Sequence, residues 1–382
     1  MSKSIVIGVD VGGTFTDTLA LDEATGAVRV EKVPSTKGDQ SNGFLSGILA
    51  ATDHDLSSVS TIIHGTTVAT NALLERKGAK AGIITTEGFR DVLEMRRRDR
   101  PSTWGLWGQF TPVIERKCRL EVPERTLANG TVVKDVDEAS IKAAAQDLIA
   151  QGCDSVCLFF INGYANTDNE TKAARILRQV WPNDYVSVAT EILPEIREFE
   201  RCSTASLNAY LQPVVANYLA RLETRIAEDD AGSEILIVQS NGGIMSVDTA
   251  KALPVRTALS GPAAGVVAAR QIAKAAGFEN VITCDMGGTS FDVSLVADGQ
   301  NMLTSQASID FGMVNRTPVI EMSTNGAGGG SIAPIDETGL LEIGTDSAGS
   351  DPGPACYGWG SERTTVTEAN WVLGRVDARK PN

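Results

Sequence analysis

Several residue types that mark particular classes of protein are scarce in this sequence. Its 382 residues include only two histidines and six cysteines, at spacings that match neither a Cys/His zinc site nor a disulfide-stabilised scaffold. Acidic residues outnumber basic ones 48 to 34, a formal net charge of −14, whereas a protein that grips a phosphate backbone needs the opposite sign. No apolar run reaches the roughly 20 residues that cross a bilayer, and the apolar run near the start is too short for a signal peptide. We therefore expect a cytoplasmic protein with reduced thiols that binds neither nucleic acid nor membrane.

Glycine, by contrast, is abundant and clustered. The 37 glycines make up about 10% of the chain, against a typical ~7%. The length suggests two domains, or three small ones, at ~150 residues each. Short apolar runs alternate with helical patterns, which favours an α/β architecture. The runs that predict strands are Ile5–Val9, Thr61–His64, Ala81–Thr85, Ser155–Ile161, Tyr185–Ala189, Ile235–Gln239 and Val281–Cys284.

The helical patterns have recognisable ends and one interruption. A capping box of Thr167 and Glu170 is predicted to open one helix. A long pattern over 198–228 is expected to connect two lobes, and Pro213 should kink or divide it. The shorter helices are predicted over 66–77, 139–150 and 167–181.

An internal repeat links the start of the chain to a region near residue 290. Residues 10–17 read DVGGTFTD and residues 285–292 read DMGGTSFD, so both fit Asp-x-Gly-Gly-Thr-x-x-Asp without a gap. Each copy lies between two strand-like runs and is predicted to be a β-hairpin with a glycine tip. Turn geometry alone can explain one such copy. Two copies in the same setting predict a duplicated lobe, as in two-lobed nucleotide phosphotransferases.

The residue types in both copies suit a polyphosphate. Paired glycines let the backbone approach an anion closely, and successive N–H groups at such a tip form an anion-binding nest. Thr14 and Thr289 add hydroxyl donors. Asp10 and Asp285 cannot favour a bare phosphate, but they suit Mg²⁺ held, through water, between carboxylate and phosphate. We interpret the two turns as a clamp on one nucleotide.

These motifs, with others along the chain, resemble the hydantoinase A/5-oxoprolinase family, which has the two-lobed ATPase fold of actin, Hsp70 and sugar kinases. The resemblance implies a first lobe over 1–197 with the first phosphate loop and a second lobe over 198–382 with the second. Family subunits are longer, which implies that the second lobe is incomplete here or continues on another chain. The matching segments are VIGVDVGGTFTDTLAL (6–21), HGTTVATNALLERKGAKAGIITTEGFRDVLEM (64–95), SNGG (240–243), SGPAAGV (260–266), CDMGGTSFDVSLV (284–296), GAGGGSIA (326–333) and SAGSDPGPACYG (347–358).

The resemblance also implies roles for individual residues. Asp10 and Asp285 would be the Mg²⁺-associated acids and, with His64, the catalytic candidates. His64 lies where a predicted strand ends and a helix begins, a usual ligand position, although a lone histidine is as readily structural. Gly328 and Gly329 are favoured as nucleotide contacts over a flexible turn. The nucleotide-binding candidates are Gly12, Gly13, Thr14, Thr16, Gly287, Gly288, Thr289, Ser290, Gly328 and Gly329.

Other features have both a structural and a functional interpretation. The segment SGPAAG (260–265) is predicted to let a helix pack closely on its neighbour. The basic cluster Arg96–Arg100 could hold an anionic substrate or bicarbonate, although a solvated charge run explains it as well. Trp104 and Trp107 fit a substrate pocket, a subunit interface or the core. Cys284 is interpreted as a small buried apolar residue rather than a nucleophile.

The resemblance implies an ATP-dependent enzyme that works with a hydantoinase B-like partner subunit. In the leading hypothesis it hydrolyses a cyclic amide, such as a hydantoin, oxoproline or a lactam. Phosphorylation of the carbonyl oxygen makes that oxygen a leaving group, and water then opens the ring. One alternative is a ketone carboxylase subunit of the acetone or acetophenone type, which would activate a ketone and bicarbonate. Another is a non-catalytic nucleotide-binding module that regulates a partner.

Overall fold

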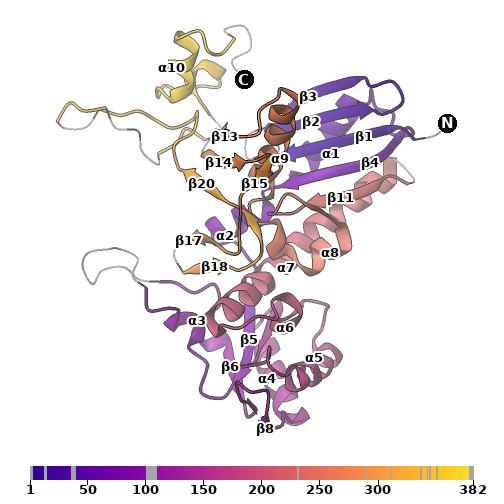
Figure 1. Cartoon of the computed structure of the whole chain (residues 1–382), viewed down its shortest axis with the longest axis vertical. Coiled ribbons are helices and arrows are strands. Elements are labelled where there is room, and N and C mark those ends of the chain that lie inside the picture. The colour runs from indigo at the N-terminus through magenta and orange to yellow at the C-terminus, as the bar shows by residue number, and fades with distance from the viewer. Residues whose placement is uncertain are drawn as a thin grey trace. The chain divides into compact units, whose positions relative to one another are not determined.

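The computed structural model divides the chain into two compact units, which Figure 1 traces from the N-terminus to the C-terminus. Unit 1 comprises residues 1–65, 261–303 and 320–382, and unit 2 comprises residues 66–260 and 304–319. The predicted lobe boundary at 197/198 therefore falls inside unit 2, and both glycine turns belong to unit 1. The residues described are 3–12, 15–35, 40–99, 110–229, 232–288, 290–310, 312–335, 338–341, 343, 346–349 and 352–377.

Unit 1 begins with a meander of antiparallel strands. β1 (Ile5–Val11) pairs with β2 (Phe15–Asp22), and β2 pairs with β3 (Val28–Pro34). β4 (Val59–Thr66) lies on the other side of β1, and α1 (Gln40–Ala51) packs against β1, β2 and β3. Alternate residues of β1 are buried, as a sheet with one covered face requires.

A second strand array in unit 1 repeats the hairpin. β13 (Val281–Met286) pairs with β14 (Phe291–Ala297), which also pairs with β20 (Met322–Asn325). The helix α9 (Ser260–Ala275) covers one face, where Ala263 and Val266 pack with Val296 and Ile320. The other elements of this part of the chain are β15 (Gln300–Asn301), β16 (Leu303–Thr304), β19 (Val319–Ile320), η3 (Ala355–Tyr357) and α10 (Val366–Val372).

Unit 2 is built on a parallel sheet with the order β10-β9-β5-β6. Its strands are β5 (Ala81–Thr86), β6 (Arg119–Val122), β9 (Ser155–Phe159) and β10 (Val186–Val188). The long helix α7 (Glu198–Asp229) covers one face, where β9 meets Ser206 and Ala209. α4 (Glu138–Ala150) covers the opposite face, where Leu148 packs against Gly82. The remaining elements are α2 (Val68–Leu74), α3 (Val92–Met95), η1 (Arg116–Cys118), β7 (Arg125–Thr126), β8 (Val132–Lys134), α5 (Asp168–Val180), α6 (Ala189–Ile192), β11 (Glu234–Val238), β12 (Ile244–Ser246), α8 (Val247–Ala252), η2 (Pro254–Thr257), β17 (Ala307–Asp310) and β18 (Met313–Asn315).

Pro213 does not divide the long helix, because α7 continues through this residue, and the alternative of a kink there stays a prediction. Proline has no N–H group for the carbonyl of the residue four positions earlier, which here is Ala209. The buried hydroxyl of Ser155 donates to that carbonyl at 2.6 Å. A hydrogen bond from the neighbouring strand thus replaces the one the proline removes.

The capping box at the start of α5 is also wrong. The Thr167 side chain makes no capping hydrogen bond, and α5 begins at Asp168. Glu170 turns inward instead, where it is fully buried and accepts hydrogen bonds from the backbone of Phe160 and Thr190. It pairs with the equally buried Arg201 at 3.4 Å. The Glu170 carboxylate, which the sequence pattern assigned to the start of the helix, therefore forms polar contacts in the core instead.

None of the helices in the described ranges is both long and apolar enough to span a bilayer.

Candidate functional site

The two copies of the repeat form hairpins with the same register. In the first, Asp10 lies opposite Asp17, and in the second Asp285 lies opposite Asp292. Each turn closes through the first glycine of the repeat, from the Gly12 N–H to the carbonyl of Phe15 at 3.0 Å and from the Gly287 N–H to that of Ser290 at 2.9 Å. The sequence repeat is therefore a structural repeat, with two carboxylates at the neck of each hairpin. The predicted tip residues Gly13, Thr14 and Thr289 lie outside the described residues.

Asp10 lies in a surface recess and is not fully buried. Its side chain keeps exposed surface, but protein atoms crowd its carboxylate, and a β-carbon added to Gly65 or Gly261 would lie 3.3 Å from its Oδ1. Partial burial, with smaller contributions from the charges of Asp17 and Asp285, raises the pKa of Asp10 to about 6. The ionised form of this carboxylate is disfavoured, and a bound cation would stabilise it.

Asp285 lies in a similar environment on the second hairpin. Burial raises its pKa above the ordinary value, and Asp292 and Asp17 add to the effect. A cavity of about 190 Å³ opens beside it. The lining residues are Pro262, Gly265, Val266 and Ala269 of α9 with Thr283, Cys284, Asp285 and Asp292. Because Asp17 acts on both Asp10 and Asp285, the two hairpins share one electrostatic neighbourhood.

One face of α9 meets both hairpins. Gly261 approaches the Asp10 carboxylate, and a β-carbon at Gly265 would lie 3.5 Å from Oδ2 of Asp285. Residues four apart lie on the same face of a helix, so the two glycines leave room for the two acids. The close packing of SGPAAG on a neighbouring element stays a prediction, and the atoms that β-carbons at these two glycines would approach belong to the acids of the candidate site. The spacing of the two glycines was the signal in the sequence that could have indicated this.

The glycine cluster at 326–331 supports the second turn from behind. The N–H groups of Gly329 and Gly330 donate to the carbonyls of Gly287 and Gly288 at 2.8 and 2.7 Å. The Gly328 N–H bonds the hydroxyl of Ser331. Gly328 and Gly329 therefore lie beside the second turn with their N–H groups in use. Their predicted contact with nucleotide stays a prediction.

Side chains, rather than backbone, support the first turn. The Ser35 hydroxyl donates to the Gly12 carbonyl at 2.8 Å, and Thr16 lies 3.0 Å from the same hydroxyl. Thr16 is fully buried, so its hydroxyl lies beneath the turn rather than at its tip. Lys32, which the sequence did not single out, pairs with Asp17 at 2.7 Å and lies 5.0 Å from the ring centre of Phe15. It brings a positive charge to the neck of the first hairpin.

His64 is the third predicted catalytic residue, and it lies in the core. It is fully buried on β4, with Nδ1 3.3 Å from the carbonyl of Val9 and its ring against that of Phe44. Burial lowers its pKa to about 4, which keeps the imidazole neutral at pH 7. Its acid–base role stays a prediction, and the geometry agrees with the structural alternative.

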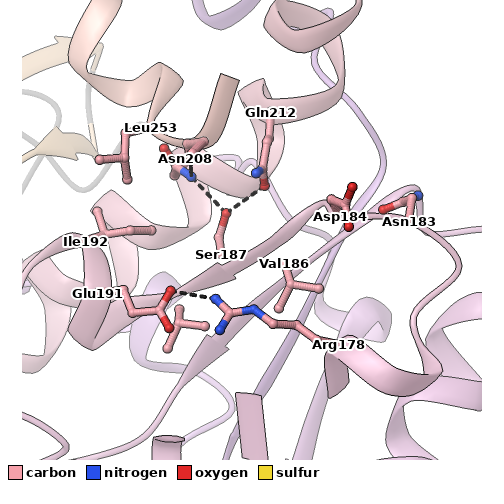
Figure 2. A pocket seen from close by; sticks show the side chains of 12 residues that line it. Arg178, Asn183, Asp184, Val186, Ser187, Glu191, Ile192, Asn208, Gln212 and Leu253 are labelled. Carbon is pink, nitrogen blue, oxygen red and sulfur yellow. Dashed lines mark hydrogen bonds and ion pairs between the residues drawn. The ribbon is translucent and has the colours of Figure 1, made fainter. Parts of the chain in front are cut away.

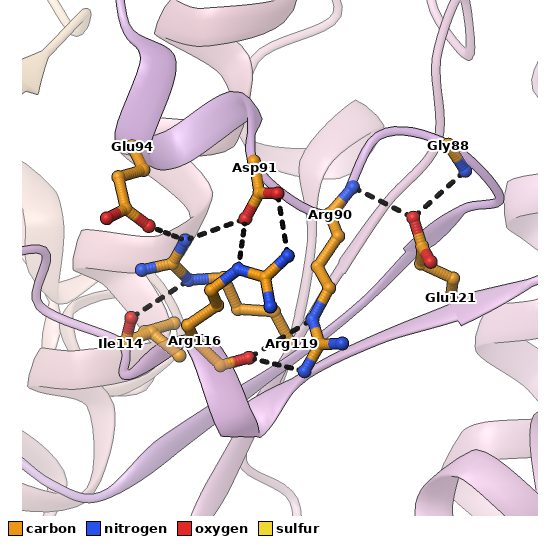
Figure 3. Close-up of polar contacts among 8 residues, drawn as sticks. All are labelled: Gly88, Arg90, Asp91, Glu94, Ile114, Arg116, Arg119 and Glu121. Atoms are coloured by element: carbon orange, nitrogen blue, oxygen red, sulfur yellow. Dashed lines mark hydrogen bonds and ion pairs between the residues drawn. The ribbon is translucent and has the colours of Figure 1, made fainter.

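Two arginines of the basic cluster after α3 form ion pairs. Arg97 bonds the carboxylates of Glu198 and Glu200, and Arg96 pairs with Asp99 at 3.1 Å. A neighbouring network continues this pattern, as Figure 3 shows: Asp91 and Glu94 receive the guanidinium groups of Arg116 and Arg119. These contacts favour a structural role. Arg100, Trp104 and Trp107 lie outside the described residues.

Cys284 is exposed, so its predicted burial is wrong. It lies on β13 between Thr283 and Asp285 and lines the cavity of the second hairpin. Within the described ranges, no three His, Cys, Asp or Glu side chains gather into a group that could by itself hold a metal ion. A cation at this site would therefore need further oxygen ligands, such as phosphate and water.

Two family descriptions cover most of the chain. Residues 6–181 match the hydantoinase/oxoprolinase N-terminal region, and residues 201–380 match hydantoinase/oxoprolinase. The break between the two matches brackets the predicted boundary at 197/198, although the compact units do not follow it.

Individual relatives carry more specific names. The chain is 35% identical to the caprolactamase alpha subunit of Pseudomonas jessenii over 96% of its own length and 54% of the relative's. It is 34% identical to the acetophenone carboxylase gamma subunit of Aromatoleum aromaticum, with shares of 97% and 53%. The crystal structure of the ATP-dependent caprolactamase from Pseudomonas jessenii superposes with a TM-score of 0.83 at 35% identity, over 97% of this chain and 55% of that one. A structure of acetone carboxylase, described as ATP-dependent, gives a TM-score of 0.79 at 28% identity, over 97% and 55%. The chain thus spans about half the length of these relatives.

Proposed function

Because the chain belongs to the hydantoinase/oxoprolinase family, we propose that it binds a magnesium–ATP complex at the twin hairpins of unit 1 and uses it to activate a small carbonyl compound. In the leading proposal that compound is a cyclic amide, which is hydrolysed. We further propose that the chain supplies the two phosphate loops of an actin/Hsp70/sugar-kinase-like ATPase, and that a hydantoinase B-like subunit works beside it. The caprolactamase and acetophenone carboxylase relatives are themselves named as subunits, which supports a partner.

The proximity of the two hairpins carries this proposal. Both belong to unit 1, both have the same register, and the charge of Asp285 raises the pKa of Asp10. Carboxylates that repel one another fit a divalent cation, because the cation removes the repulsion. Asp10 and Asp285 would hold magnesium together with phosphate oxygens and water.

The chain's own residues would bind and orient rather than react covalently. When bound, the magnesium nucleotide supplies an activated phosphoryl group that makes a carbonyl oxygen a leaving group. Gly12, Gly287 and Gly288 let the backbone approach the phosphates, and their supports hold the turns in place. Lys32 lies where it can offset part of the negative charge at the first hairpin. Catalysis of this kind rests on positioning and electrostatics, which such supports provide.

The second candidate function is carboxylation of a ketone with bicarbonate. It is favoured by the similarity to the acetophenone carboxylase gamma subunit and to the acetone carboxylase structure. The caprolactamase relative, at similar identity and a higher TM-score, favours the cyclic amide. A regulatory nucleotide-binding module is the third candidate.

One experiment separates these candidates. The chain is produced with the subunit encoded beside it, and ATP consumption is measured with hydantoin, 5-oxoproline, caprolactam, or acetophenone plus bicarbonate. Stimulation by an amide supports the leading proposal, stimulation that needs bicarbonate supports the carboxylase, and no stimulation supports the module. Asp285→Asn should abolish any stimulated turnover. Asp298→Asn, an exposed position at the far end of β14, is the matched control and should leave it unchanged.

A further inference from the structure

A second cavity lies in unit 2 along the edge of the parallel sheet. It measures about 260 Å³, just below the ~300–1,000 Å³ typical of ligand sites. β10 is the last strand of that sheet, and all three of its residues line the cavity. As Figure 2 shows, the walls come from both faces of this strand, with Arg178 and Glu191 on one side and Asn208 and Gln212 on the other. The cavity therefore follows the outer edge of β10.

The backbone of β10 presents one acceptor and one donor to this edge. The carbonyl of Tyr185 accepts from the Val156 N–H of β9, so the next N–H, that of Val186, points away from β9. Directions alternate along an extended strand, and Val188 is extended with φ −102° and ψ 123°. The Val186 carbonyl and the Val188 N–H thus both face outward. Neither has a hydrogen-bond partner among the residues that the structure describes.

The side chains beside this edge are buried, polar and held in place. The Ser187 hydroxyl accepts from Asn208 Nδ2 at 2.9 Å and donates to Gln212 Oε1 at 3.2 Å. Gln212 is only 6% exposed, and within the described part of the chain its amide nitrogen has no acceptor. This nitrogen is not among the described buried atoms that lack a partner, so it opens onto the cavity, where its donors can bond a ligand.

We propose that the edge of β10 binds an extended peptide segment of a partner polypeptide as an additional parallel strand. In a parallel pair, the N–H of a residue donates to the carbonyl of the residue that precedes its opposite number on the other strand. Its carbonyl accepts from the N–H of the residue that follows that opposite number. Val186 and Val188 offer those two groups on either side of Ser187. A peptide residue opposite Ser187 would point its side chain toward Gln212, where an asparagine or threonine oxygen can accept. Its two neighbours would point to the side of Val186 and Val188, where they can pack on the two valines beside the paired Arg178 and Glu191.

Charge adds a further element to the recognised sequence. Asp184, exposed and three residues before Ser187, has no charged partner among the described residues. Arg178 and Glu191 neutralise each other at 2.6 Å. A basic peptide residue three positions before the one that faces Ser187 would complement Asp184. The edge therefore selects five successive peptide residues. They are a basic residue, any residue, an apolar residue, an asparagine or threonine opposite Ser187, and a second apolar residue.

The test uses a fluorescein-labelled, end-capped hexapeptide of sequence Lys-Thr-Val-Asn-Val-Thr and measures fluorescence anisotropy with the whole chain. We expect saturable binding that Gln212→Leu weakens about 3- to 10-fold, the loss of one hydrogen bond. A probe N-methylated at its asparagine loses the N–H that meets the Val186 carbonyl and should bind at least about tenfold more weakly. A probe N-methylated at the following valine, whose N–H points away from β10, is the matched control and should bind within about twofold of the parent.

Three results would overturn the proposal. They are the absence of saturable binding, equal losses from the two N-methylated probes, and full binding to a folded Gln212→Leu variant. Saturable binding of caprolactam, measured by calorimetry, without binding of the hexapeptide would also overturn it, because the cavity would then serve a small molecule. The methylated probes need no change to the protein, so the test stands even if the variant misfolds.

Discussion

The two units differ in the charges that surround their buried and partly buried ionisable side chains. In unit 2, Glu170 and Arg201 are fully buried and pair with each other, and Arg119 pairs with Glu94. In unit 1, Asp10 and Asp285 lie near carboxylates of the same sign, and their pKa values rise. In a buried pair each charge offsets part of the desolvation cost of the other, so the loss of one partner is costly, whereas like charges held together repel one another until a cation binds. The comparison separates the buried charge pairs in the core of unit 2 from the neighbouring acids of unit 1, where we propose that a cation binds.

The largest effect should follow from breaking the buried pair of unit 2. Arg201→Leu leaves the Glu170 carboxylate buried without its charge partner and should lower the free energy of unfolding by about 3–5 kcal/mol. Urea denaturation measures this loss. The double variant Glu170→Met with Arg201→Leu should recover a large part of it. A double variant as unstable as the single one would mean that the pair is not what the core requires.

Neutralising Asp10 should have the opposite effects on binding and stability. Asp10→Asn should weaken magnesium–nucleotide binding on the order of 100-fold, measured by calorimetry. Because the pKa of Asp10 is raised to about 6, the folded wild type binds this proton more tightly than the unfolded chain, and it loses stability as pH rises from about 4 to 6. The variant should therefore be more stable than wild type at pH 7 without ligand, and the difference should disappear below pH 4. Equal stability at both pH values would contradict the contrast between the units.

The supports of the second turn can be tested with a pair of glycines. In Gly330→Ala the new β-carbon would lie 2.8 Å from the Gly288 carbonyl oxygen, and we expect a loss of about 1–3 kcal/mol with weaker nucleotide binding. In Gly265→Ala the nearest atom is 3.5 Å away, an ordinary contact, so stability should change little. Thermal unfolding with and without magnesium–ATP compares them. If Gly330→Ala behaves as Gly265→Ala does, the backbone support is not needed.

The smallest effect should come from His64. Burial lowers its pKa to about 4, so the unfolded chain binds the proton more tightly, and the wild type loses stability as pH falls from about 6.5 to 4. His64→Gln should remove this loss, a difference of under about 1 kcal/mol between pH 7 and 6. Thermal unfolding at both pH values measures it. Retention of turnover by this variant would support the structural role, and loss of turnover with normal stability would support the catalytic prediction.

The sequence predicted the features that depend on neighbours along the chain. The two hairpins and the α/β character follow from local patterns, and the structure agrees with them. It did not predict features that depend on distant partners. The helix continues through Pro213, where the Ser155 hydroxyl bonds the carbonyl that the proline leaves free. Glu170 does not cap its helix because it pairs with Arg201 in the core. Lys32 was missed because its partner Asp17 lies on the adjacent strand.

Asp17 gives the first hairpin an influence on the second. It belongs to the first repeat, yet its charge raises the pKa of both Asp10 and Asp285. The proton affinity of Asp10 therefore depends in part on the charges of Asp17 and Asp285, and that of Asp285 depends in part on the charge of Asp17. A cation bound at the neck of one hairpin would therefore lower the pKa of the acid at the other and release its proton. The affinity for magnesium and the pKa values of these acids would then depend on each other.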